Sequence, residues 1–130
     1  CKIDREIPLI HIHGTKDRLQ KYNKSDGDFL STIESVNYWA KYNQLDKIVF
    51  ENMEDVHKQD RTTVERYTYS KDNSDTKVIH LKVVNGGHLW LGSHISDWFL
   101  RLFIGKNNHE INSSKELVDF FLQYKLSDFN

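Results

Sequence analysis

Two segments of the chain share one pattern, in which an apolar strand runs into glycine and then into a side chain that can handle a proton. The first is LIHIHGTKD (9–17), which delivers Asp17, and the second is VVNGGHLW (83–90), which delivers His88. The apolar run of the first segment is typical of a strand covered on both faces, as in a parallel sheet. The pattern predicts an α/β fold, with a carboxylate and a histidine at the C-terminal ends of two strands. These are two of the three groups of a nucleophilic catalytic site.

The rest of the chain predicts a small set of further elements. A capping-box pattern at 31–34 and apolar residues at i, i+3 and i+7 predict a helix over about 32–42. Residues 48–60 are weaker and indicate a short strand followed by a loop. Alternation over 62–69 and the run 77–84 predict two strands joined as an antiparallel hairpin. A second capping box at Ser113–Glu116 predicts a closing helix to about Lys125. We expect a single domain over 1–130.

Composition excludes several classes of protein. A net charge of −1 favours neither nucleic acid nor an anionic membrane as a partner. No apolar run approaches the length that crosses a bilayer, and the most apolar patch, Trp98–Ile104, is interrupted by Arg101. The lone cysteine, Cys1, cannot form an internal disulfide. Its place at position 1 suggests that the chain is a piece of a longer protein.

Three residues are candidates for a functional site. Asp17 would orient a histidine and stabilise its charged form, and His88 would take a proton from a nucleophile and pass it to a leaving group. Trp90 would wall a substrate pocket. The alternatives are an ordinary turn aspartate, a solvated loop histidine and a tryptophan that only packs. Gly86-Gly87 would give the backbone angles closed to other residues and leave room for a substrate beside the His88 ring.

Other motifs argue against cofactor and metal chemistry. His11 and His13 share one face of their strand, but no third ligand is evident, so we expect no metal site and no cofactor. His13 is expected to be a buried, hydrogen-bonded residue behind the acid loop. No P-loop or G-x-G-x-x-G is present, and neither is the G-x-S-x-G turn that carries the serine of α/β-hydrolases.

Taken in order, several short motifs resemble a known family. They are HGTKD (13–17), YN (22–23), SVNYWA (35–40), TTVERYTY (62–69), GGHLW (86–90) and EINSS (110–114) before a Phe-Phe helix. Together they resemble the C-terminal half of a polyhydroxybutyrate-depolymerase or feruloyl-esterase-like α/β-hydrolase. The resemblance implies that Asp17 and His88 are the triad acid and base, and that the serine and oxyanion hole lie in an absent N-terminal half. It also implies that Cys1 pairs with an upstream cysteine in longer members. Leu89 and Leu91 depart from the family pattern around the histidine.

The resemblance implies a serine-type carboxylic ester hydrolase, acting on polyester or on phenolic or acetyl esters of polysaccharide. It also implies a secreted or periplasmic protein. The alternatives are a non-catalytic binding module on the same scaffold, and a peptidase or thioesterase of the same fold. The first strand is expected to lack neighbours on one side. This edge would pair with the missing half of the fold or with another copy of the chain.

Overall fold

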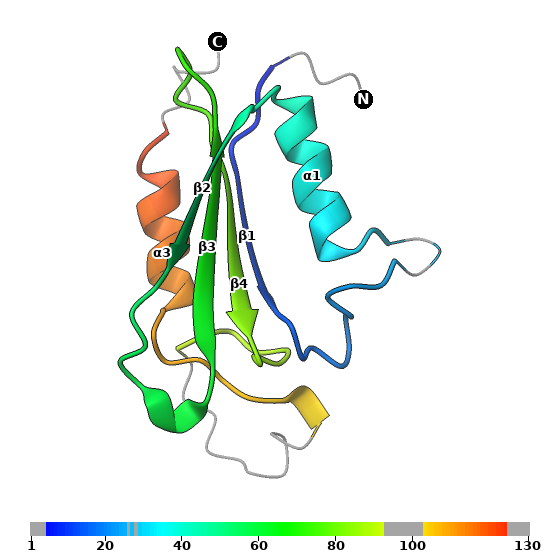
Figure 1. Cartoon of the computed structure of the whole chain (residues 1–130), viewed down its shortest axis with the longest axis vertical. Helices are drawn as coiled ribbons and strands as arrows, with labels where there is room; N and C mark the ends of the chain where they lie inside the picture. Colours follow the sequence, from blue (N-terminus) through cyan, green and yellow to red (C-terminus); the bar gives the residue numbers. More distant parts are fainter. Residues whose placement is uncertain (1–4, 26, 28, 93–102, 125–130) are drawn as a thin grey trace.

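The computed structural model of the chain describes residues 5–25, 27, 29–92 and 103–124. In this part, a mixed four-stranded sheet lies between two helices, with α1 over one face and α3 over the other (Figure 1). The strands are β1 (Leu9–Gly14), β2 (Lys47–Asn52), β3 (Thr63–Ser70) and β4 (Val78–Val84); the helices are α1 (Thr32–Tyr42) and α3 (Ser113–Phe121), and a 3-10 turn, η1 (Lys58–Asp60), lies between β2 and β3. The predicted α/β class is confirmed at this level. Neither of these helices is long and apolar enough to span a membrane.

The strand order in the sheet is β1-β4-β3-β2. β1 runs parallel to β4, with His11 opposite His80, whereas β3 is antiparallel to both β4 and β2. The predicted hairpin is therefore confirmed as β3–β4, and the weaker region 48–60 contains β2, a loop and η1. Within the described residues, β1 and β2 each have a neighbouring strand on one side only.

β4 is the central strand of the packing, because it is covered on both faces. Its odd-numbered residues, Ile79, Leu81 and Val83, are buried on the face covered by α3. They form one apolar cluster with Val64, Leu91, Ile111 and Phe120. Burial of each such side chain contributes roughly 1.5–3 kcal/mol. On the other face α1 contributes its own buried positions, Val36 and Ala40, as predicted, whereas Ile33, the first residue of the predicted helical stripe, is exposed.

The two helices begin differently. In α1 the predicted capping box is confirmed, because Ser31 accepts from the Glu34 amide and the Glu34 side chain accepts from the Ser31 amide. The second predicted capping box is wrong. The N-cap of α3 is Asn112, which accepts from the Lys115 amide.

The serine expected to cap α3 has another partner. The Ser113 hydroxyl accepts from the Leu91 amide, so it ties the helix to the segment that follows His88. α3 also ends at Phe121 rather than near Lys125. Of the predicted apolar patch Trp98–Ile104, residues 98–102 lie outside the described residues.

Asn43 joins α1 to the entrance of β1. It is buried directly after the helix, where its Oδ1 accepts from the Ile7 amide (2.9 Å) and its Nδ2 donates to the Ile7 carbonyl (2.7 Å). Its own carbonyl accepts from Lys71 Nζ (2.9 Å). One side chain therefore supplies the backbone pairing that a neighbouring strand would otherwise provide.

We predict that Asn43→Ala lowers the free energy of unfolding by about 2–3 kcal/mol, because two backbone groups lose their partners at a buried site. Urea denaturation followed by circular dichroism measures the change. Asn37→Ala, on the exposed face of α1, is the matched control and should change stability by less than about 0.5 kcal/mol. Equal losses in the two variants would contradict the role of Asn43.

Candidate functional site

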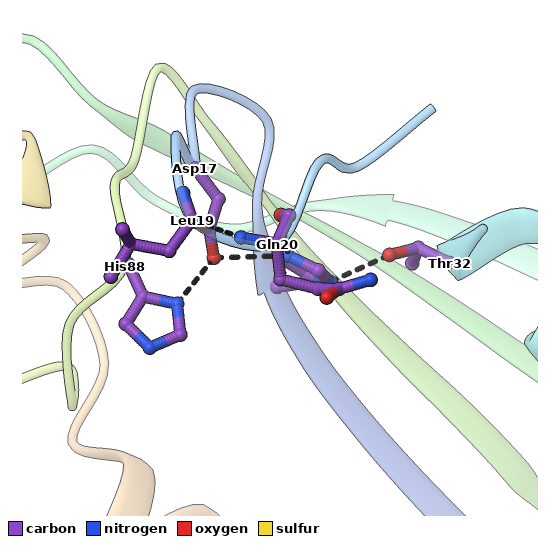
Figure 2. Close-up of polar contacts among 6 residues, drawn as sticks. Asp17, Leu19, Gln20, Thr32 and His88 are labelled. Carbon is purple, nitrogen blue, oxygen red and sulfur yellow. Dashed lines mark hydrogen bonds and ion pairs between the residues drawn. The ribbon is translucent and has the colours of Figure 1, made fainter. Parts of the chain in front are cut away.

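The structure brings Asp17 and His88 into direct contact. β1 ends at Gly14 and a tight turn leads to Asp17, while β4 ends at Val84 and two glycines lead to His88. Because β1 and β4 are adjacent and parallel, their C-terminal ends lie side by side. His88 Nδ1 donates to Asp17 Oδ2 at 2.7 Å (Figure 2). Two residues 71 positions apart thus form one charge-assisted hydrogen bond.

The carboxylate of Asp17 is held from several directions. The residue is only 8% exposed. Its Oδ1 accepts from the Leu19 and Gln20 amides, both at 2.9 Å, and its Oδ2 accepts from His88 and from His13 Nε2 (3.2 Å). Burial alone would raise the pKa of Asp17, but hydrogen bonds from Gln20, His88 and Leu19 outweigh it and hold the pKa below its usual value. The group is therefore an ionised acceptor in a fixed orientation.

His13 supports this carboxylate from behind. Its Nε2 faces two acceptors, Asp17 Oδ2 and the Gln20 carbonyl (3.0 Å), so this nitrogen carries the proton. Its Nδ1 accepts from the Thr32 hydroxyl (2.6 Å) at the start of α1. The expected hydrogen bonding of His13 agrees with these contacts, whereas its side chain is 12% exposed and thus not fully buried as expected. The sequence did not predict its bond to Asp17. The sequence signal that could have predicted this bond is the four-residue spacing between His13 and Asp17, with Gly14 between them.

Close backbone contact explains the glycines at the two strand ends. A Cβ on Gly14 would lie 2.4 Å from the Gly86 carbonyl oxygen, and one on Gly87 would lie 2.0 Å from the Ile104 carbonyl oxygen. Both distances are too short for any side chain. The amide of Gly87 also donates to the Lys106 carbonyl at 2.8 Å. The strand ends therefore meet only because these positions have no side chain.

The predicted reason for Gly86-Gly87 was wrong. Neither residue has a positive φ, and the left-handed position is Asn85 (φ 61°). The space beside Gly87 is filled by the backbone of Ile104 and Gly105 rather than left for a substrate. The glycines serve close packing instead of unusual backbone angles.

His88 is accessible on its other side. Its side chain is 51% exposed, and its ring turns one nitrogen toward Asp17 and the other away from it (Figure 2). Nε2 is therefore placed to exchange a proton with a group that approaches from outside. Trp90 is also exposed, and its Nε1 donates to Ser114 Oγ at 2.9 Å at the beginning of α3. This bond fixes the indole near the site without showing a substrate contact.

A cavity of about 630 Å³ lies beside Asp17. Its lining includes five cationic residues, together with the backbone turns at the two strand ends; the five are Lys16, Arg18, Lys21, Lys24 and Lys106. His88 and Trp90 are not part of this lining. In a chain of net charge −1, this concentration of positive charge favours a ligand that carries negative charge. Composition alone gave no sign of the cavity.

The remaining histidines of β1 and β4 belong to the packed layer beneath α1. His80 is buried, where its Nδ1 donates to the His11 carbonyl (3.1 Å) and its Nε2 accepts from the Tyr22 hydroxyl (2.7 Å). Burial lowers the pKa of both His11 and His80 to about 4. The His11 and His13 rings lie 5.7 Å apart on one face of β1, as predicted. Among the described residues, no group of three or more His, Cys, Asp or Glu side chains could hold a metal ion.

We predict that acidification from pH 6.5 to 4 destabilises the fold through these buried histidines. The folded pKa of His80 is about 4, below the unfolded value near 6.5, so its contribution is complete above pH 6.5 and is lost as the pH falls toward 4. The loss is at most about 3 kcal/mol for this one group. Urea unfolding across this pH range measures it.

His80→Gln should flatten this pH dependence, leaving the part that His11 contributes. His57→Gln, which removes an exposed imidazole, is the control and should keep the steep wild-type profile. A His80→Gln profile as steep as wild type would show that His80 is not buried as a neutral ring.

We also predict that neutral His88 carries its proton on Nδ1, because this nitrogen faces the carboxylate. Long-range ¹H–¹⁵N NMR spectra distinguish the two ring tautomers. Asp17→Ala should shift the population toward the Nε2–H form that a free histidine side chain prefers. A tautomer unchanged by this substitution would exclude the Asp17 bond in solution.

Comparison of the chain with protein-family models, with curated proteins and with solved structures found no match in any of the three. The hydrolase resemblance therefore depends on the sequence motifs alone.

Proposed function

We propose that this chain supplies the acid and the base of a serine-type carboxylic ester hydrolase. The observation that carries the proposal is the bond between His88 Nδ1 and a buried, ionised Asp17 at the ends of two adjacent parallel strands. An aspartate in this position fixes the tautomer of the ring and stabilises the imidazolium that forms when the ring takes a proton.

In the proposed reaction, a serine hydroxyl attacks the ester carbonyl and His88 Nε2 takes its proton. The imidazolium then gives this proton to the departing alcohol, leaving an acyl-serine. Water attacks the acyl-serine, His88 again takes and returns a proton, and the carboxylic acid leaves. Asp17 keeps its charge throughout and does not itself take the proton.

The serine comes from outside this chain, since the chain has no G-x-S-x-G turn. Among the described residues no strand pairs with the outer edge of β1, next to the loop that carries Asp17, so this edge offers a place for the strands of that missing half. Oxyanion-hole donors belong to the same missing half. The proposal is therefore for a longer protein in which this chain forms the C-terminal part of the catalytic domain.

The cationic cavity supports a narrower substrate class. In an ester of a carboxylate-bearing polysaccharide, the carboxylates would lie against Lys16, Lys21 and Lys106 while the ester carbonyl faces Asp17 and His88. Acetyl and phenolic esters of such polymers fit this description better than an uncharged polyester.

We predict that Asp17→Asn and His88→Ala each lower kcat by about 10³–10⁴-fold in the protein that contains this chain and its upstream segment, because the proton transfers lose their base or its orientation. Hydrolysis of an activated acetate ester measures the rate. KM should change by less than about threefold, since neither group binds the substrate ground state. His57→Ala, at an exposed histidine remote in sequence from both strand ends, should retain wild-type kcat.

Labelling with a fluorophosphonate identifies the nucleophile, because this reagent modifies activated serines. The labelled residue should lie upstream of residue 1, and labelling should fall sharply in His88→Ala. Two results would contradict the proposal. One is turnover by the isolated 130-residue chain that Ser93→Ala or Ser96→Ala abolishes. The other is a longer protein that neither hydrolyses esters nor reacts with the reagent, which is the outcome expected of a binding module.

A further inference from the structure

β2 exposes an apolar edge at the end of the sheet away from the Asp17–His88 site. Ile48, Val49 and Phe50 are 62%, 53% and 49% exposed. Every residue of the strand is exposed, so neither face of β2 is covered within the described part of the chain. Edge strands of soluble proteins are usually interrupted by charges, proline or bulges. Here the charges, Lys47 and Glu51, flank an uninterrupted apolar centre.

The backbone of β2 has groups available for a further strand. Met53, one residue past the strand, donates to the Val64 carbonyl of β3 at 2.9 Å. Because hydrogen-bonded positions alternate along an antiparallel ladder, residues 51, 49 and 47 also turn their backbone groups toward β3. Residues 48, 50 and 52 therefore turn their amides and carbonyls outward. An incoming strand would bond to Ile48 and Phe50.

The charges of β2 match a second copy of the same strand. If two β2 strands run antiparallel with Val49 on the two-fold axis, Lys47 of each copy faces Glu51 of the other. In this register Ile48 faces Phe50, so the outward backbone groups of the two copies also meet as hydrogen-bonded pairs. Val49 then faces Val49 in a non-hydrogen-bonded pair. Charge, apolar contact and backbone direction agree in this one register.

Each face of the sheet would continue across such a junction. One face carries the odd-numbered residues of β2, and there Arg66 of β3 lies opposite Glu51. In the dimer, Glu51 would also lie beside Lys47 of the second copy. Positive and negative charges would therefore alternate across the three strands. On the other face, the Phe50 and Tyr67 rings lie 5.1 Å apart, and Ile48 of the second copy would extend this apolar row. Opposite charges and apolar pairs facing across strands are stabilising.

We infer that β2 is a self-association surface, through which two copies of the chain join their sheets edge to edge about a two-fold axis at Val49. The surface lies at the opposite edge from β1, so it stays available whether or not β1 pairs with another segment. The inference is independent of the proposed ester hydrolysis.

Sedimentation velocity and light scattering at increasing concentration test the association. The chain should pass from one to two copies as its concentration rises over about 1–500 µM. Lys47→Glu places a carboxylate opposite Glu51 at both ends of the junction, and Glu51→Lys places two ammonium groups together. Each variant alone should dissociate at least about tenfold more readily than wild type.

An equimolar mixture of these two variants provides the matched control. In the mixed pair, each altered residue faces an opposite charge, so a dimer should reappear with nearly wild-type affinity. Lys47 also bonds to Asp72 within its own chain, and mixing does not restore that bond. Recovery on mixing therefore separates the contact between copies from any effect within one chain.

Cysteine cross-linking tests the register directly in a Cys1→Ser background. Val49→Cys places two thiols in a non-hydrogen-bonded pair, where Cα atoms lie about 4.5 Å apart, within the range of a disulfide. Asn52→Cys places them roughly 20 Å apart and should give no cross-linked dimer. The inference fails if the chain stays a monomer at all concentrations. That result is expected if β2 is covered by its own chain or pairs only with a strand of another protein. The inference also fails if the two charge variants do not rescue each other, or if Asn52→Cys cross-links as well as Val49→Cys.

Discussion

Parallel pairing of β1 with β4 is the interaction on which the rest of the structure depends. These strands are separated by more than 60 residues, yet their registered pairing from Leu9–Val78 to Gly14–Val83 brings both C-terminal ends to one edge. That edge carries Asp17 and His88. A slip of two residues along the ladder would move one side chain by roughly 6–7 Å and break the hydrogen bond between them. The site is therefore a direct product of strand register.

Much of the local structure could be predicted from the sequence, because it depends on short-range patterns. Patterns among neighbouring residues predicted three features: the helical stripe ending at Ala40, the Ser31 capping box and the β3–β4 hairpin. The positions of Asp17 and His88 at strand ends were equally readable. Their contact followed from an α/β arrangement, in which parallel strands share one carboxyl edge.

The features that the sequence did not predict depend on contacts between residues that only the folded chain brings together. His13 contacts Asp17 because the loop folds back across Gly14, and the sequence predicted a hydrogen-bonded His13 without identifying Asp17 as its partner. Ser113 fails to cap α3 because its hydroxyl accepts from Leu91, 22 residues away. The exposed edge of β2 could not be seen either, since an apolar strand has the same pattern whether it lies at the centre or the rim of a sheet. Topology decides between these cases.

The contact between Gly14 and Gly86 has a consequence for how this chain can vary. Any side chain at Gly14 or Gly87 would push the strand ends apart. Direct contact between backbone atoms therefore fixes the distance between Asp17 and His88. The cationic residues around the neighbouring cavity are mostly exposed and have no such restriction. In the proposed hydrolase, ligand selectivity and the geometry of proton transfer would therefore belong to different residues, and substitutions of the cavity cations would leave the Asp17–His88 distance unchanged.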